Sequence, residues 1–135
     1  MKLNPYLEFD GNAAEALAYY ADLLGGTIVS SMTYAEMPGD FDWVDDSNRE
    51  RLANGVLVFD DNVLMASDTA GFEPFKGYSG VTLQLDIKDT EEGAALFAKL
   101  ADGGEVKMAY EATFWASGFG MCTDKYGVPW MIHVE

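Results

Sequence analysis

The fold is decided by residues 113–135, TFWASGFGMCTDKYGVPWMIHVE. Within this stretch, Asp124-Lys125-Tyr126-Gly127 is a turn signal between two short runs of aromatic and aliphatic residues. The pattern predicts a β-hairpin that closes a sheet, so the chain is expected to end on core strands. Phe114 and Trp115 precede the hairpin in a predicted loop beside small residues, and we expect their rings to face a cavity.

Working outward from the hairpin, two earlier stretches share one pattern. Residues 3–9 and residues 81–87 both alternate between apolar and polar side chains, which is typical of half-buried strands. A helix is predicted after each: Asn12 with Glu15 forms a capping-box-like start, and Asp89 with Glu92 repeats it 77 residues later. The chain is therefore predicted to contain an internal duplication.

The first helix is expected to bury one stripe and to end at two glycines. Its predicted apolar stripe consists of Ala16, Tyr19, Tyr20 and Leu23. Gly25-Gly26 ends it, and Gly103-Gly104 ends the second helix. Further strands are predicted at residues 27–36, 52–59, 62–67, 105–110, 119–124 and 129–134. The sequence thus predicts a single α+β domain over residues 1–135, built from two tandem βαβββ modules at about 1–70 and about 78–135.

Each predicted sheet has an apolar face under its helix and a more polar face without cover. Two such sheets side by side would form a cupped surface, and a cavity there is the default ligand site. The polar positions of the first strand of each module are Asn4, Tyr6 and Glu8 in one and Thr82, Gln84 and Asp86 in the other. We expect these side chains to line the cup.

Several of these motifs resemble one protein family. The pattern from Phe114-Trp115 through Gly120-Met121 to Asp124-Lys-Tyr-Gly-Val-Pro-Trp-Met-Ile132 resembles the C-terminal signature of the PhnB-like branch of the glyoxalase/bleomycin resistance/dioxygenase (vicinal oxygen chelate) superfamily. The resemblance extends to Asn4-Pro-Tyr-Leu7 and Leu64-Met-Ala-Ser-Asp68, so it covers most of the chain. It implies a glyoxalase-type fold in which paired modules, often from two chains, enclose a small-molecule ligand.

The metalloenzymes of this superfamily place His, Gln or Glu ligands on the first and fourth strands of each module. By strand pattern, the corresponding positions here are Asn4, Met65, Thr82 and Met131. Hard divalent cations prefer carboxylate, imidazole or thiolate ligands. The sequence therefore predicts no metal and no other cofactor. His133, the only histidine, is on the same strand face as Met131, so a site formed by His133 with Glu8, Asp86 or Glu135 stays open.

The net charge of the chain limits the classes of ligand and partner that it can bind. Its 23 acidic and 8 basic residues give a formal net charge of −15, which repels nucleic acid and anionic membrane surfaces and favours neutral or cationic ligands. No apolar run is long enough for a membrane span, and no signal-peptide pattern is present. Cys122 is the single cysteine, so it has no partner for an intrachain disulfide. We expect an acidic cytoplasmic protein with a buried, inert Cys122, and a homodimer because cupped sheets leave aromatic surface for a second chain.

The acidic segment 37–51 interrupts the strand pattern. It is expected to be a mobile, solvated loop whose Phe41 and Trp43 cover the cup or a partner chain. Its four aspartates lack the glycine and terminal glutamate of an EF-hand loop. The chain also contains no dinucleotide, P-loop or Gly-x-Ser-x-Gly pattern, so it gives no support to the methyltransferase name applied to some relatives.

Three functional hypotheses follow from these observations. The favoured one is a small-molecule-binding protein without a metal. The alternatives are a drug-sequestering protein of the bleomycin-resistance type, suggested by the negative charge, and a metal-dependent lyase or dioxygenase that uses His133 and Glu8. The candidate ligand-binding residues are Tyr6, Glu8, Met65, Gln84, Phe114, Trp115 and His133.

Overall fold

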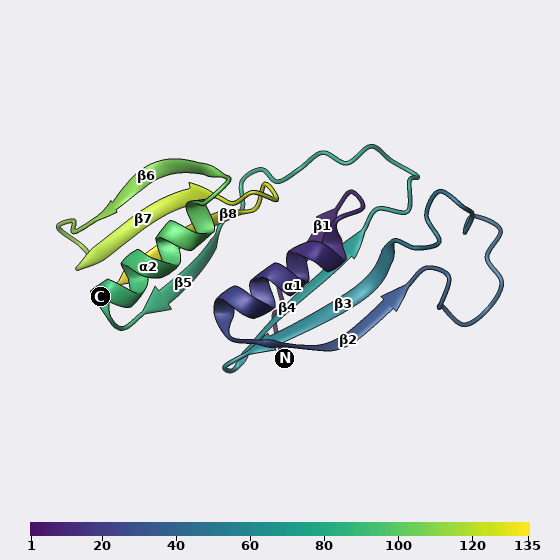
Figure 1. Ribbon diagram of the computed structural model, residues 1–135, viewed down its shortest axis with the longest axis horizontal. Helices are drawn as coiled ribbons and strands as arrows, with labels where there is room; N and C mark the ends of the chain where they lie inside the picture. The colour runs from purple at the N-terminus through teal and green to yellow at the C-terminus, as the bar shows by residue number, and fades with distance from the viewer. The chain divides into compact units, whose positions relative to one another are not determined.

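The computed structural model describes residues 1–135 and contains the predicted βαβββ arrangement twice (Figure 1). The first module comprises β1 (Tyr6–Phe9), α1 (Ala13–Leu24), β2 (Thr27–Thr33), β3 (Leu52–Phe59) and β4 (Asn62–Asp68). The second comprises β5 (Leu83–Ile87), α2 (Thr90–Ala101), β6 (Glu105–Glu111), β7 (Gly118–Thr123) and β8 (Pro129–Val134). Backbone contacts divide the chain into two compact units, Met1–Gly77 and Tyr78–Glu135.

Each module forms one four-stranded mixed sheet. The strand orders are β1-β4-β3-β2 and β5-β8-β7-β6, and the first two strands of each order are parallel while the other pairs are antiparallel. A parallel pair needs a crossover connection, and the helix-containing segment after β1 and β5 supplies it. The α+β fold with two βαβββ modules is therefore confirmed.

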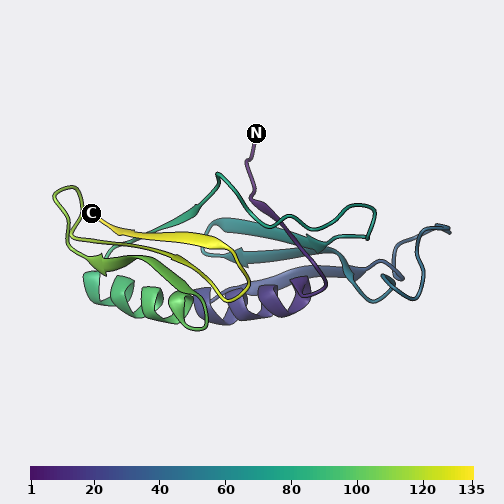
Figure 2. The same ribbon diagram turned by 90° about the horizontal axis from the view of Figure 1, so that it is seen from above.

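In each module the helix covers one face of its own sheet (Figure 2). The buried residues of α1 are Ala13, Ala16, Leu17 and Tyr20, which follow the i, i+3, i+4, i+7 spacing of one helical face. The predicted stripe was thus rotated: Leu17 belongs to it, whereas Tyr19 and Leu23 at its margin are only partly buried. The helix limits Asn12 and Gly25 are confirmed, and Gly25 has the left-handed conformation that ends a helix.

The two helix starts are built differently. The predicted cap of α2 is confirmed, since the Asp89 carboxylate accepts a hydrogen bond from the Glu92 N–H at 3.0 Å. The predicted capping role of Asn12 is wrong, because its side chain makes no cap bond. Asp68 at the end of β4 takes this role: its Oδ1 accepts from the Gly11 and Ala13 N–H groups at 2.8 and 2.9 Å. Its Oδ2 accepts from the Leu52 N–H at 2.9 Å.

The first strand of each module begins later than predicted. β1 begins at Tyr6 and β5 at Leu83, so Asn4 and Thr82 precede the strands. Pro5 has no N–H to give to a ladder, although its carbonyl still accepts from the Met65 N–H at 3.0 Å. Within β1 the predicted alternation is confirmed, since Leu7 and Phe9 are buried and Tyr6 and Glu8 are exposed.

A tyrosine joins the edge strand of the second module to its helix. The Tyr110 hydroxyl on β6 donates to the Thr90 carbonyl at 2.8 Å. Its ring end lies so close to Gly93 of α2 and Gly118 of β7 that a Cβ at either position would collide with the hydroxyl oxygen. The two glycines therefore form the slot that Tyr110 fills.

Candidate functional site

The uncovered face of the second sheet carries two transverse rows of side chains. Residues paired across neighbouring strands point to the same face, so the strand register assembles these rows. The first row runs Asp86, His133, Phe119 and Glu111 across β5, β8, β7 and β6. The second runs Gln84, Met131, Met121 and Met108. The face thus combines polar groups on β5 with aromatic and thioether side chains on the other strands.

Hydrogen bonds fix three polar side chains of this face. The Gln84 Nε2 donates to Asp86 Oδ1 at 2.9 Å, and the His133 Nδ1 lies 3.0 Å from the same oxygen. The His133 and Phe119 rings form a T-shaped pair, with 6.5 Å between the ring centroids. Asp86 is largely exposed, whereas 25% of the His133 side chain is exposed. The imidazole is therefore packed on one side and held in orientation by a carboxylate.

A compact turn presents the two predicted aromatic residues. The Thr113 Oγ1 accepts from the Trp115 and Ala116 N–H groups at 3.3 and 3.1 Å, and the Thr113 N–H donates to the Ala116 carbonyl at 3.0 Å. Trp115 is 48% exposed and its ring packs edge-on against Phe119 at 5.4 Å. Phe114 is almost fully exposed and touches only Trp115 among the aromatic rings, at 4.7 Å. Trp115 thus forms an aromatic wall with Phe119.

An open hollow of about 530 Å³ adjoins this face. Its lining residues are Asp86, Ile87, Lys88, His133 and Glu135. Its volume lies within the range of small-molecule pockets. Lys88 is the single cation among two carboxylates and one imidazole, so the surroundings of His133 are polar and predominantly acidic.

The uncovered face of the first sheet brings together the other predicted residues. Tyr6 pairs with Met65, and Glu8 pairs with Ser67, on the parallel strands β1 and β4. Two further residues belong to this face and were missed by the sequence reasoning: Asn54, whose Oδ1 accepts from the Tyr6 hydroxyl at 3.4 Å, and Tyr34. Asn54 follows the two-residue alternation of β3, which was a usable signal.

Tyr34 lies just past the end of β2, which ends at Thr33 and is therefore three residues shorter than the predicted strand 27–36. Its hydroxyl donates to the Asp68 carbonyl at 2.6 Å. Burial, together with the nearby negative charges of Asp68 and Glu8 and the hydroxyl of Tyr6, raises the pKa of Tyr34. It therefore acts as a neutral donor.

The acidic segment packs its aromatic residues within the first module. Trp43 contacts Tyr34, Phe41 and Phe72, with ring centroids 5.3 to 5.6 Å apart. The buried Asn48 holds the segment by donating from Nδ2 to the Trp43 and Ala70 carbonyls at 2.9 and 3.0 Å. The aromatic residues thus form a local cluster, while the four aspartates of the loop are exposed as expected.

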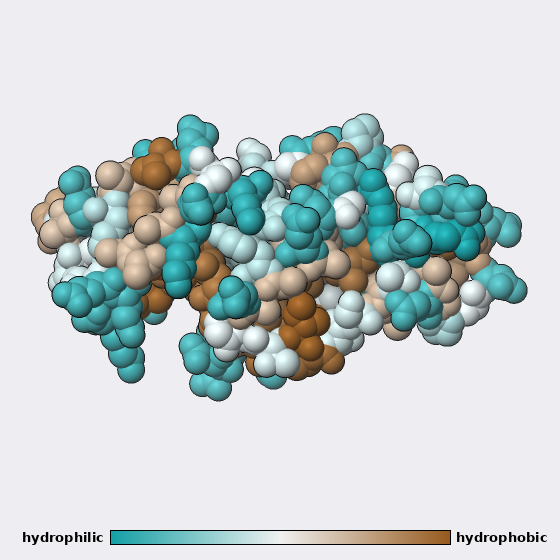
Figure 3. Space-filling model, viewed as in Figure 1, coloured by the Kyte–Doolittle hydropathy of each residue, from teal (hydrophilic) through white to brown (hydrophobic).

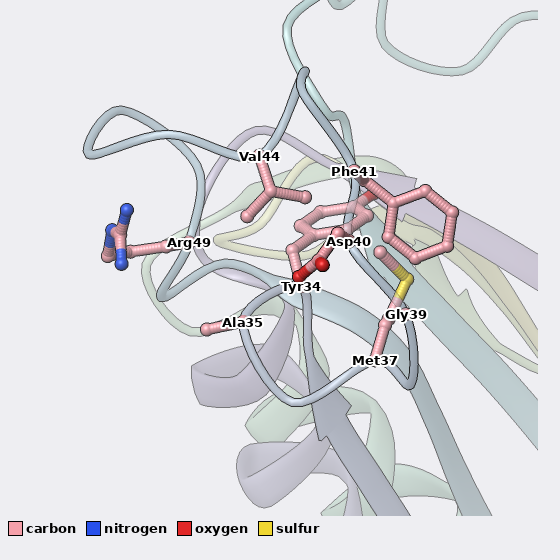
Figure 4. Close-up of a pocket in the computed structure, with 8 residues that line it drawn as sticks. All are labelled: Tyr34, Ala35, Met37, Gly39, Asp40, Phe41, Val44 and Arg49. Carbon is pink, nitrogen blue, oxygen red and sulfur yellow. The ribbon is translucent and has the colours of Figure 1, made fainter.

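A small hollow of about 220 Å³ opens beside this cluster (Figure 4). Tyr34, Met37, Phe41 and Val44 gather around it, whereas the Arg49 guanidinium points away from them. Arg49 pairs with Asp46 at 3.1 Å on the surface. None of the predicted site residues lies there.

Neither module contains an assembled metal centre. No group of three or more His, Cys, Asp or Glu side chains is arranged to hold a metal ion. Met65 and Met131 lie on the uncovered faces as predicted, beside Tyr6 and Gln84 respectively. Cys122 is buried, and burial followed by the nearby Asp124 raises its pKa to about 11, so it is a neutral thiol at pH 7.

The face of the molecule drawn in Figure 3 is mostly hydrophilic, with apolar residues in separate patches. None of the helices is long and apolar enough to cross a membrane.

Comparison with solved structures first defines the fold class. The fosfomycin resistance protein FosX from Listeria monocytogenes has a TM-score of 0.68 at 10% identity over 99% of this chain and 92% of that chain. The PhnB protein from Bacillus cereus has a TM-score of 0.83 at 24% identity over the whole of both chains. The chain thus has the glyoxalase/bleomycin resistance fold.

Sequence comparison then gives the family. The chain belongs to the PhnB-like family described as 3-demethylubiquinone-9 3-methyltransferase, whose model matches residues 1–133. It is 40% identical to protein YjdN of Escherichia coli K12, over 99% of this chain and 95% of that protein. Protein PA1353 from Pseudomonas aeruginosa is 37% identical over 100% of this chain and 98% of that chain, with a TM-score of 0.91. The family resemblance predicted from the motifs is confirmed.

Proposed function

We propose that the protein binds a small molecule on the uncovered face of its second sheet. The observation that carries this proposal is the placement of Trp115: a tight turn holds its ring half exposed against Phe119, although burial of the whole ring would be more stabilising. Gln84 and His133 supply polar contacts beside this aromatic wall. A few fixed polar groups next to an apolar surface are the usual composition of a ligand site.

The ligand class follows from the charges around the site. The carboxylates of Asp86 and Glu135 flank His133, and Lys88 is the single cation of the adjoining hollow. The net charge of −15 adds a long-range field of the same sign. We therefore propose a neutral or cationic ligand, with a further contact from Phe114. The reaction in the family description is not part of this proposal, because the sequence has no nucleotide-binding fingerprint.

Titration of three antibiotics of different charge tests the proposal: cationic bleomycin, neutral chloramphenicol and anionic fosfomycin. We expect bleomycin or chloramphenicol to bind, measured by calorimetry, and the Trp115→Ala variant to weaken that binding about tenfold or more, equivalent to about 1.4 kcal/mol. Phe72→Ala, which removes an exposed aromatic ring outside the site, serves as the control and should leave the affinity unchanged.

Binding that Trp115→Ala leaves intact would contradict the assignment to this face, and binding of fosfomycin alone would contradict the ligand class. Tight, salt-sensitive binding of bleomycin would favour the drug-sequestering alternative. Elemental analysis tests the metal-dependent alternative. One equivalent of a transition metal per chain, lost in His133→Ala, would replace the present proposal.

We further propose that the protein is a cytoplasmic homodimer. Exposed aromatic surface at Tyr6, Phe114 and Trp115 supports a second copy as the partner, since burial of such surface drives association. Light scattering coupled to size-exclusion chromatography measures the molar mass of the assembly, and a monomer mass at micromolar concentration would exclude the dimer.

A further inference from the structure

His133 is the one imidazole of the chain, and its surroundings specify which nitrogen carries the proton. A carboxylate only accepts hydrogen bonds, so the contact of 3.0 Å between His133 Nδ1 and Asp86 Oδ1 requires the proton on Nδ1. In neutral imidazole the second nitrogen, Nε2, then keeps a free electron pair. The strand register thus produces a histidine whose Nε2 is ready to accept a proton.

Gln84 adds a second constraint on this arrangement. Its Nε2 donates to the same oxygen, Asp86 Oδ1, at 2.9 Å, which keeps a largely exposed carboxylate in place. Gln84 and Asp86 are two residues apart on β5, and Asp86 pairs with His133 on β8. The chain from Gln84 through Asp86 to His133 therefore follows from the parallel pairing of the first and last strands of the module.

The environment of the imidazole suits a proton transfer. The ring forms a T-shaped pair with Phe119 and borders the hollow of about 530 Å³, which has room for a ligand. The charged groups around it are Asp86 on β5, Lys88 after β5, Glu135 after β8 and Glu111 on β6 in the same transverse row. Lys88 supplies positive charge for an oxygen that becomes negative.

We propose that His133 is a general base, oriented by Asp86 and Gln84, for a hydroxyl group or a water molecule held in the site proposed above. In this step the O–H bond breaks, its proton forms an N–H bond at Nε2, and the oxygen keeps the electron pair. The resulting imidazolium donates to Asp86 from Nδ1 and later returns the proton from Nε2 to solvent or product. This inference rests on the proposed ligand site, and it identifies the substrate class as small neutral or cationic molecules whose reaction begins by deprotonation of oxygen.

The tautomer can be measured without any ligand, because the chain has one histidine. Long-range ¹H–¹⁵N correlation spectra at a pH where the imidazole is neutral should show the Nδ1–H tautomer in the wild type. Asp86→Ala should shift it toward the Nε2–H tautomer, whereas Asp102→Asn, which removes a remote carboxylate of the same module, should leave it unchanged. An Nε2–H tautomer in the wild type would overturn the proposal.

Reactivity is tested with p-nitrophenyl acetate as the probe. Water loses a proton to Nε2, its oxygen bonds to the ester carbon, and p-nitrophenolate leaves with the electrons of its C–O bond. We expect the wild type to accelerate hydrolysis about tenfold or more over His133→Gln. The hydrolysis rate of Asp86→Ala should lie between those of the wild type and His133→Gln, and the rate of Asp102→Asn should equal that of the wild type. Equal rates for wild type and His133→Gln would overturn the proposal.

These experiments distinguish a failure of the ligand-site proposal from a failure of the general-base proposal. Loss of the ligand site is detected as an antibiotic affinity that Trp115→Ala does not change, whereas the tautomer spectra contain no ligand. Circular dichroism of each variant shows that it is folded before its rate is compared.

Discussion

Replacement of Trp130 by alanine is expected to lower the free energy of unfolding by about 3–5 kcal/mol, the range for removal of a large core aromatic residue. Trp130 is 2% exposed on β8, and its indole Nε1 donates to Asp124 Oδ2 at 2.8 Å. The carboxylate of Asp124 also accepts from the Tyr126 and Val128 N–H groups at 2.8 and 3.0 Å. The substitution therefore removes core packing and one bond of the network that shapes the final turn.

Trp115→Ala is the matched comparison and should cost clearly less stability. Its ring is half exposed, so it has fewer packed atoms to lose. Urea denaturation of both variants under identical conditions measures the difference. Equal losses of unfolding free energy would show that Trp115 is core and would contradict its assignment to the ligand site.

The second large effect is expected at Asp68. Asp68→Ala leaves the N–H groups of Gly11, Ala13 and Leu52 without their acceptor, and at roughly 1–3 kcal/mol for each buried unsatisfied donor, partly offset by water, the loss should be about 3–5 kcal/mol. Asn12→Ala is the control, because Asn12 holds the N-cap position without a cap bond, and it should cost less than about 0.5 kcal/mol. Chemical denaturation of both variants measures the two losses of unfolding free energy. A larger loss for Asn12→Ala would mean that the local residue, and not β4, caps the helix.

The duplication and most element limits were predictable because they depend on short-range patterns. Alternation along a strand and the spacing of Asp89 and Glu92 are local signals, and β3 and β8 were predicted with their observed limits. The role of Asp68 was not predictable, because its three donors lie 16 to 57 residues away in the chain. Only the parallel pairing of β1 with β4 brings it to the helix.

The candidate site was likewise predictable where it depends on local sequence and not where it depends on contacts between distant residues. The exposure of Trp115 could be anticipated from the small residues that follow it in a predicted loop. The contact between His133 and Asp86 was one of three pairings that the sequence left open, beside those with Glu8 and Glu135, because 47 residues separate the two side chains and the strand register decides whether they meet. The position of Tyr34 depends on where β2 ends: the predicted strand continued to residue 36, whereas β2 ends at Thr33, although the Tyr34 N–H still donates to the Arg51 carbonyl at 3.0 Å.

The different caps of the two helices have a consequence for the order of folding. The start of α2 is stabilised by Asp89, three residues from its donor, so this turn can form as soon as its own segment is collapsed. The start of α1 depends on Asp68, which arrives only when β4 joins the sheet, and a contact of such sequence separation carries a greater loop-closure cost. Although the modules share one architecture, we expect the amides of the first turn of α2 to gain protection before those of α1 in pulse-labelling hydrogen exchange during refolding. Simultaneous protection of both turns would show that the duplicated halves fold as one cooperative unit.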